Sequence, residues 1–92
     1  MPDFVVEVLS DSTKQRDYGV KFQDYEKHGI AEYWIIDADD EAVEQYLLHG
    51  GKYQLEERKR DGIIESRVIK GFRIPVRAMF DKEEFLKTLN SF

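Results

Sequence analysis

Two short stretches decide the fold of this chain: Phe4-Val5-Val6-Glu7-Val8-Leu9 and Glu32-Tyr33-Trp34-Ile35-Ile36-Asp37. Both are nearly continuously apolar and rich in β-branched or aromatic residues. That pattern is typical of short strands that are buried on both faces of a sheet. The first stretch is interrupted by a single acid, Glu7, and the second is bounded by acids at its two ends.

The sequence between these strands predicts a helix over residues 14–28. Tyr18, Phe22 and Tyr25 follow helical spacing, and Gly29 is placed to end the helix. A strand, a helix and a second strand predict a right-handed parallel crossover within one sheet.

The rest of the chain predicts antiparallel strands and a last helix. Turn residues at 37–41 and 49–52 separate them, with a further polar turn at 58–62. The expected strands cover residues 43–48, 53–57, 63–69 and 72–76, and Asp81 caps a helix with Phe85, Leu86 and Leu89 on its inner face. We therefore predict a mixed α/β (α+β) domain with one incomplete sheet, spanning residues 1–92 as a single domain.

Composition excludes several classes of site. The 92 residues contain no cysteine and only two histidines, His28 and His49, so disulfides and a structural zinc site are not expected. A hard cation held by carboxylates remains compatible with this composition. The chain lacks a run of ~20 apolar residues and the features of a signal peptide, which predicts a cytoplasmic protein without membrane spans. The net charge of −5 makes no overall case for nucleic-acid binding.

Glu7 is the first candidate for chemistry, because it lies in the middle of an apolar strand. A buried carboxylate is unfavourable unless it is paired, protonated or bound to a metal. The alternative is a structural acid at the rim of the sheet that pairs with a nearby Lys or Arg.

Lys21 is the second candidate. Asp17, Lys21 and Tyr25 recur every four residues and therefore share one stripe of the predicted helix. An ordinary surface pair between Asp17 and Lys21 is the alternative. Because the helix directly follows the Glu7 strand, Lys21 is expected to reach toward the C-terminal end of that strand, where open α/β sheets tend to carry active sites.

Asp3 is not expected to join Glu7 in one metal site. Four residues along a strand span roughly 13 Å at about 3.3 Å per residue, whereas the oxygens on a shared cation lie within about 2.5 Å of it. Asp3 is therefore interpreted as a residue that precedes the strand, and a second acid would have to come from a neighbouring strand.

The remaining candidates are interpreted as structural. Tyr33 and Trp34 are expected in the core rather than on a stacking platform, and Asp37 as a turn residue rather than an acid behind a metal ligand. Several cations in the second half of the chain could contact phosphate, but acids are interspersed among them, which favours a solvated face. These cations are Arg58, Lys59, Arg60, Arg67, Lys70, Arg73 and Arg77.

The sequence resembles the Uma-type restriction endonucleases, a family long catalogued as a domain of unknown function. The resemblance runs nearly end to end and is most specific in the first forty residues. It rests on Pro2 through Ser10, Ser12-Thr13, Asp17, Lys21, Tyr25, Gly29-Ile30, Glu32 through Asp37, and Gly71-Phe72 through Phe80.

This resemblance implies a restriction-endonuclease-like core of the PD-(D/E)XK nuclease superfamily. Such enzymes hold Mg²⁺ with acids on two adjacent strands and use a lysine to orient or activate water. Glu7 matches the second acid and would be the metal ligand. Leu9 stands where the lysine of the motif is expected, and Lys21 matches the position to which family members move that lysine onto the following helix.

The same resemblance implies that the chain corresponds to the C-terminal half of a family member. Family proteins are about twice as long, and the strand with their first metal-binding Asp matches nothing here. We therefore expect an N-terminally truncated core with Glu7 and Lys21 close in space, impaired or inactive as a hydrolase, and with weak or absent Mg²⁺ binding.

Two alternatives to this impaired nuclease stay open. One is a non-catalytic oligomerisation or interaction module that keeps the nuclease fold. The other is a half-site whose missing acid comes from a partner subunit. Strands 4–9 and 32–36 are too apolar for half-exposure, which predicts a homo-oligomer with residues 4–9 near the contact. DNA is the ligand that the resemblance implies.

Overall fold

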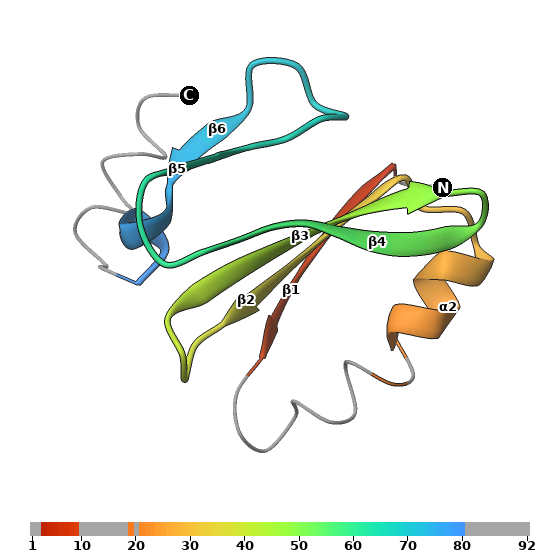
Figure 1. The fold of residues 1–92 in the computed structure, drawn as a ribbon, viewed down its shortest axis with the longest axis horizontal. Helices are drawn as coiled ribbons and strands as arrows, with labels where there is room; N and C mark the ends of the chain where they lie inside the picture. The colour runs from red at the N-terminus through yellow and green to blue at the C-terminus, as the bar shows by residue number, and fades with distance from the viewer. Residues whose placement is uncertain (1–2, 10–18, 20, 81–92) are drawn as a thin grey trace.

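The computed structural model describes residues 3–9, 19 and 21–80 of the chain. Its elements follow the expected order of strand, helix, strand and then several strands (Figure 1). They are β1 (Phe4–Leu9), α2 (Phe22–Lys27), β2 (Glu32–Asp37), β3 (Ala42–His49), β4 (Lys52–Lys59), β5 (Ile63–Glu65), β6 (Arg73–Pro75) and the 3-10 helix η2 (Val76–Met79).

Four strands form one mixed sheet in the order β1-β2-β3-β4. β1 and β2 are parallel, with Glu7 opposite Ile35, so the predicted parallel pairing is confirmed. β2, β3 and β4 follow as an antiparallel meander. Gly50 and Gly51 both have positive φ, at 57° and 83°, as the tight turn between β3 and β4 requires.

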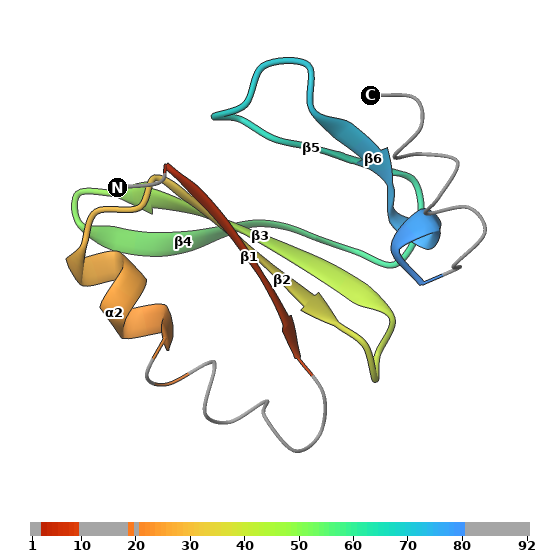
Figure 2. The same ribbon diagram turned by 180° about the vertical axis from the view of Figure 1, so that it is seen from behind.

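Each face of this sheet is covered by a different part of the chain. Figures 1 and 2 show α2 and the β5–β6 pair on opposite sides of the sheet. We call these sides the α2 face and the β5–β6 face. On the α2 face, buried Leu9, Tyr33, Ile35 and Tyr53 pack with Phe22 and other partly buried side chains.

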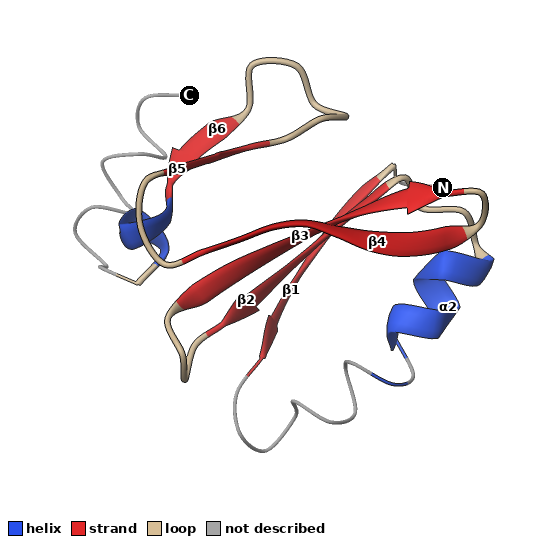
Figure 3. Cartoon of the chain, in the orientation of Figure 1, coloured by secondary structure: helices blue, strands red, loops and turns tan. Residues whose placement is uncertain are grey.

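The β5–β6 face has a core of its own. Trp34 and Val43 of the large sheet pack against Ile64, Ile74, Val76 and Ala78 of the small one and of η2. Figure 3 shows the two sheets as separate groups of strands, whereas one incomplete sheet was predicted. The chain leaves the large sheet after Lys59, and Pro75 lies at the end of β6, opposite Ile63, where a strand tolerates its missing N–H.

Several predicted boundaries differ from the structure. β4 continues through Arg58 and Lys59, which had been expected in a turn, and β5 ends at Glu65 instead of residue 69. Gly29 ends α2 with a positive φ of 74°, as predicted. The earlier part of that helix and the final helix expected from Asp81 lie outside the described residues.

Val6 and Val8 of β1 are 40% and 61% exposed, so the described part of the chain does not cover both faces of this strand. The sequence predicts that another copy of the chain supplies this cover, and that stays a prediction. β1 is an edge strand among the described elements, and these two side chains lie beyond the part of the β5–β6 face that Ile64 and Ile74 cover. Tyr33 and Trp34, at 0% and 1% exposure, are core residues as predicted. No helix in the described part of the chain is long and apolar enough to cross a membrane.

Candidate functional site

Glu7 and Lys21 meet on the α2 face of the sheet. Strand alternation turns the Glu7 side chain toward α2, between Val5 and Leu9 of the same cluster. Lys21 Nζ lies 3.1 Å from Glu7 Oε2, and the side chains are 43% and 20% exposed, respectively. The predicted proximity of these two residues is confirmed, and Lys21 comes from the segment that follows β1, as expected.

Tyr25 completes this cluster. Its hydroxyl donates a 2.6 Å hydrogen bond to Glu7 Oε1, so the two carboxylate oxygens have different donors. Tyr25 follows Lys21 by four residues, which brings both donors to one side of the helix. The helical stripe predicted from the sequence is thus confirmed for these two residues, while Asp17 lies outside the described part of the chain.

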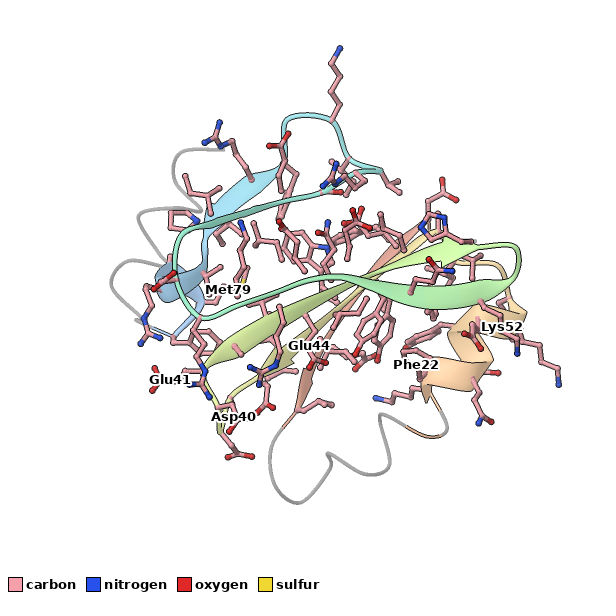
Figure 4. All side chains as sticks on the ribbon, in the orientation of Figure 1. Phe22, Asp40, Glu41, Glu44, Lys52 and Met79 are labelled. Carbon is pink, nitrogen blue, oxygen red and sulfur yellow. The ribbon has the colours of Figure 1, made fainter. Side chains whose placement is uncertain are left out.

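An aromatic layer fixes the position of α2 and hence of the two donors. Phe22 points from α2 to the sheet in Figure 4, and its ring lies 5.2 Å from the rings of Tyr46 and Tyr53. Edge-to-face contacts of this kind add to the burial energy of the rings. Burial, with the nearby charge of Glu26, raises the pKa of Tyr53 to about 12. Tyr53 also donates to the Ile30 carbonyl at 2.7 Å.

The donor set around Glu7 does not by itself fit Mg²⁺, the ion that the resemblance implies. Mg²⁺ takes oxygen ligands in near-ideal octahedral geometry, and dedicated sites need further anionic ligands. Residues 3–9, 19 and 21–80 contain no group of three or more His, Asp or Glu that could hold a metal ion. The described residues therefore supply an acid, a cation and a hydroxyl, but not a complete metal site.

The other acids considered for the site have structural roles. Asp37 is 1% exposed, and its Oδ1 accepts hydrogen bonds from the backbone N–H groups of Asp39 and Asp40, both at 3.1 Å. This is the turn that the sequence predicts. Asp3 precedes β1, and its carbonyl accepts from Glu32 N–H at 3.0 Å.

Four of the candidate phosphate-binding cations are paired with acids, as the interspersed charges predicted. Arg58 lies between Asp40 at 3.1 Å and Glu44 at 3.2 Å, and Arg77 lies 2.6 Å from Glu41. Figure 4 shows the labelled acids at and beside the turn between β2 and β3. Lys59 pairs with Glu57 and Arg67 with Glu56, at 3.5 and 3.8 Å.

Sequence reasoning missed Glu32, a fully buried acid on the β5–β6 face. Its Oε2 accepts from Trp34 Nε1 at 2.6 Å and Gln45 Nε2 at 2.7 Å. Its Oε1 accepts from Ser66 Oγ at 2.8 Å and from the N–H groups of Arg67 and Val68 at 2.9 and 3.0 Å.

These donors favour the ionised form of the Glu32 carboxylate. Burial alone would raise its pKa, but the hydrogen bonds from Gln45, Val68, Ser66 and Trp34 outweigh burial and lower the pKa below its ordinary value. The signal in the sequence was Gln45, a polar residue that alternates with Val43 and Leu47 on a face that should be apolar.

Comparison with known proteins agrees with this fold. Among solved structures, the chain is similar to one described as a "putative nuclease belonging to DUF820" from Anabaena variabilis ATCC 29413. The TM-score is 0.65 at 21% sequence identity, and the match covers 86% of this chain but 44% of that one. The match shows a shared nuclease-like fold, and this chain spans less than half of that protein's length.

No curated protein matches the sequence significantly. The Uma2 family, described as "Putative restriction endonuclease", matches residues 1–77. That match includes β1, α2 and the whole four-stranded sheet, together with β5 and β6. Because it extends over most of the sequence and agrees with the fold, the chain belongs to the Uma2 family of restriction-endonuclease-like proteins.

Proposed function

We propose that this protein is an endonuclease-type phosphodiester hydrolase in which Glu7 and Lys21 are the acid and the lysine of the site. The observation that supports it is the 3.1 Å contact between Lys21 Nζ and Glu7 Oε2 on the strand and helix that the family motif names. An ammonium group held beside a carboxylate can orient water and stabilise negative charge that develops on a phosphate.

Residues 1–92 on their own are, in this proposal, impaired for cleavage. The reason is the donor set, because the described residues hold no group of acids that could bind a metal ion, and the family is of the metal-dependent kind. Binding of Mg²⁺ or Mn²⁺ should be weak, with Glu7 as its ligand.

Plasmid nicking separates this function from a purely structural ion pair. The purified chain is incubated with supercoiled DNA and Mn²⁺, as are the variants Glu7→Gln, Lys21→Met and Lys27→Met. Lys27 is the matched control, because it lies in the last turn of the same helix and is exposed. Slow nicking should be lost in the first two variants and kept in the third. Nicking that survives both Glu7→Gln and Lys21→Met contradicts the assignment.

Calorimetry provides a readout that does not depend on cleavage. The chain should bind Mn²⁺ weakly, at millimolar rather than micromolar concentration, and Glu7→Gln should remove this binding. Tight binding would overturn the proposed impairment and would point to another acid, with Asp37 the first to replace.

A second candidate function is a non-catalytic homo-oligomer, and the exposed side chains of β1 favour it. Val6 and Val8 are exposed on a strand that lies at the edge of the described sheet, and such edges invite pairing with another chain. Contact between two copies through β1 should bury on the order of 1,000 Å².

Light scattering tests this second candidate. The parent should be a dimer or larger at micromolar concentration, and Val6→Lys with Val8→Lys should give a folded monomer. Ile63→Lys is the control, because Ile63 is a 42% exposed apolar residue of β5, outside the edge strand β1. A parent that is already a folded monomer rejects the oligomer. Nicking that rises steeply with chain concentration would instead indicate a site completed by a partner subunit.

A further inference from the structure

The charges of the chain are divided unevenly between its two parts. Residues 58–80 contain seven Lys or Arg and two Asp or Glu, whereas the other described residues contain three and twelve. This segment includes β5, β6 and η2. Acids from the rest of the chain pair with Arg58, Lys59 and Arg77, so these cations add little positive charge to the surface. The local positive charge of interest is that of the loop between β5 and β6. A local basic region, and not the net charge, is what meets a polyanion.

Within this segment, several hydrogen bonds hold the loop between β5 and β6. Its first half is fixed to the buried Glu32 carboxylate by Ser66 Oγ and by the N–H groups of Arg67 and Val68. Ser66 Oγ in turn accepts from Ile69 N–H at 2.8 Å, and Ser66 N–H donates to the Phe72 carbonyl at 2.9 Å. The loop is thus closed at its base and attached to the large sheet.

The residues that this loop presents to solvent are not those of an ordinary surface turn. Val68 and Ile69 are 38% and 42% exposed, and they lie between two exposed cations, Arg67 and Lys70. The Arg67 side chain contacts Glu56 at 3.8 Å, and both side chains are exposed, so this ion pair contributes little in water. A fixed backbone therefore presents two aliphatic side chains flanked by two positive charges.

We propose that residues 67–70, at the tip of the loop between β5 and β6, contact nucleic acid. This contact is separate from the Glu7 site, which lies on the α2 face of the sheet. The cations would meet phosphates, and Val68 and Ile69 would pack on sugars or base edges in a groove, where proteins often insert aliphatic side chains. Because the loop is already ordered, binding loses little backbone entropy. The choice of nucleic acid over an acidic protein surface rests on the nuclease function proposed above.

Fluorescence anisotropy with a labelled 20-base-pair duplex, in EDTA to prevent cleavage, tests this contact. Arg67→Gln with Lys70→Gln should weaken binding at least tenfold at low salt. It should also reduce the slope of log K against log salt by about 1.8, the value for two phosphate contacts. Val68→Ser with Ile69→Ser should weaken binding about three- to tenfold without changing that slope.

The matched control is Lys27→Gln with Lys52→Gln, which removes the same charge from the α2 side of the molecule. It should bind the duplex within about twofold of the parent. Equal losses in this control and in the loop variants would overturn the proposal, and so would unchanged binding in both loop variants. Urea unfolding curves that match the parent show that the loop variants remain folded.

Failure of this contact and failure of the proposed hydrolase are distinguishable. Glu7→Gln should bind the duplex like the parent, because Glu7 faces the other side of the sheet. If the duplex does not bind the parent but poly-glutamate does, the loop contacts an acidic protein and the nucleic-acid proposal is wrong. If Glu7→Gln loses nicking while the loop variants bind the duplex as the parent does, the loop contact is wrong. The proposed role of Glu7 is then unaffected.

Discussion

Glu7 and Glu32 lie on neighbouring strands of one sheet, yet they face opposite layers and have different surroundings. Glu7 keeps 20% of its side-chain surface in solvent and has two donors among the described residues, Lys21 and Tyr25. Glu32 is completely buried and accepts five hydrogen bonds, none of them from a charged side chain.

This difference in burial and in donors is the reason why Glu7, and not Glu32, is the acid proposed for chemistry. A carboxylate whose lone pairs are all taken by fixed donors is a structural centre, because exchanging any donor leaves a buried group unsatisfied. A partly exposed carboxylate, with a partly exposed lysine beside it, can exchange partners with water. The buried acid of this fold is therefore not the one proposed for chemistry.

The largest expected effect is on the core that surrounds Glu32. Ile64→Ala should lower the free energy of unfolding by about 3–5 kcal/mol, because Ile64 is fully buried against Trp34 and leaves a cavity. Ile63→Ala, at the neighbouring and exposed position, should lower it by less than about 1 kcal/mol. Urea unfolding measures both, and equal effects would show that β5 does not pack as part of this core.

Glu32→Gln is expected to have the next largest effect. An amide replaces one of the two accepting oxygens with a donor that faces other donors, so at least two buried groups lose their acceptor. The free energy of unfolding should fall by about 2–3 kcal/mol. Glu65→Gln, an exposed neighbour in β5, should change it little. A stable Glu32→Gln variant would mean that the loop from Ser66 is not held by this carboxylate.

The stabilising effect of Glu32 is expected to depend on pH. The pKa of Glu32 is lowered in the folded protein from its ordinary value of 4.5. Its stabilising effect is therefore complete above pH 4.5 and is lost as the pH falls through the lower folded value. Urea midpoints measured from pH 7 to pH 3 should converge for the parent and Glu32→Gln. A constant difference across that range would contradict the lowered pKa.

The smallest effect is expected for Glu7 and Lys21. A double-mutant cycle with Glu7→Gln and Lys21→Met should give a coupling energy of about 0.5–1 kcal/mol, because the pair is partly exposed to water. The same variants should change nicking far more than stability. A coupling of several kcal/mol, without any effect on nicking, would support the structural ion pair that was the alternative from the start.

The sequence by itself determined the parallel β1–β2 pair, the helix between them, the β3–β4 hairpin and the meeting of Glu7 with Lys21. All of these depend on local patterns, namely apolar runs, helical spacing, Gly50-Gly51 and a helix that directly follows its strand. The catalytic roles of Glu7 and Lys21 stay predictions.

The tertiary structure alone decided which acid is buried and which strand face is covered. Glu32 looked like an ordinary residue at the start of a strand, because its donors Ser66, Arg67 and Val68 lie more than thirty residues away. For the same reason Val6 and Val8 looked buried: an apolar run shows that a strand can be covered, but the cover comes from distant parts of the chain. The burial of a side chain depends on contacts with residues that are distant in the sequence, and a local sequence pattern does not show these contacts.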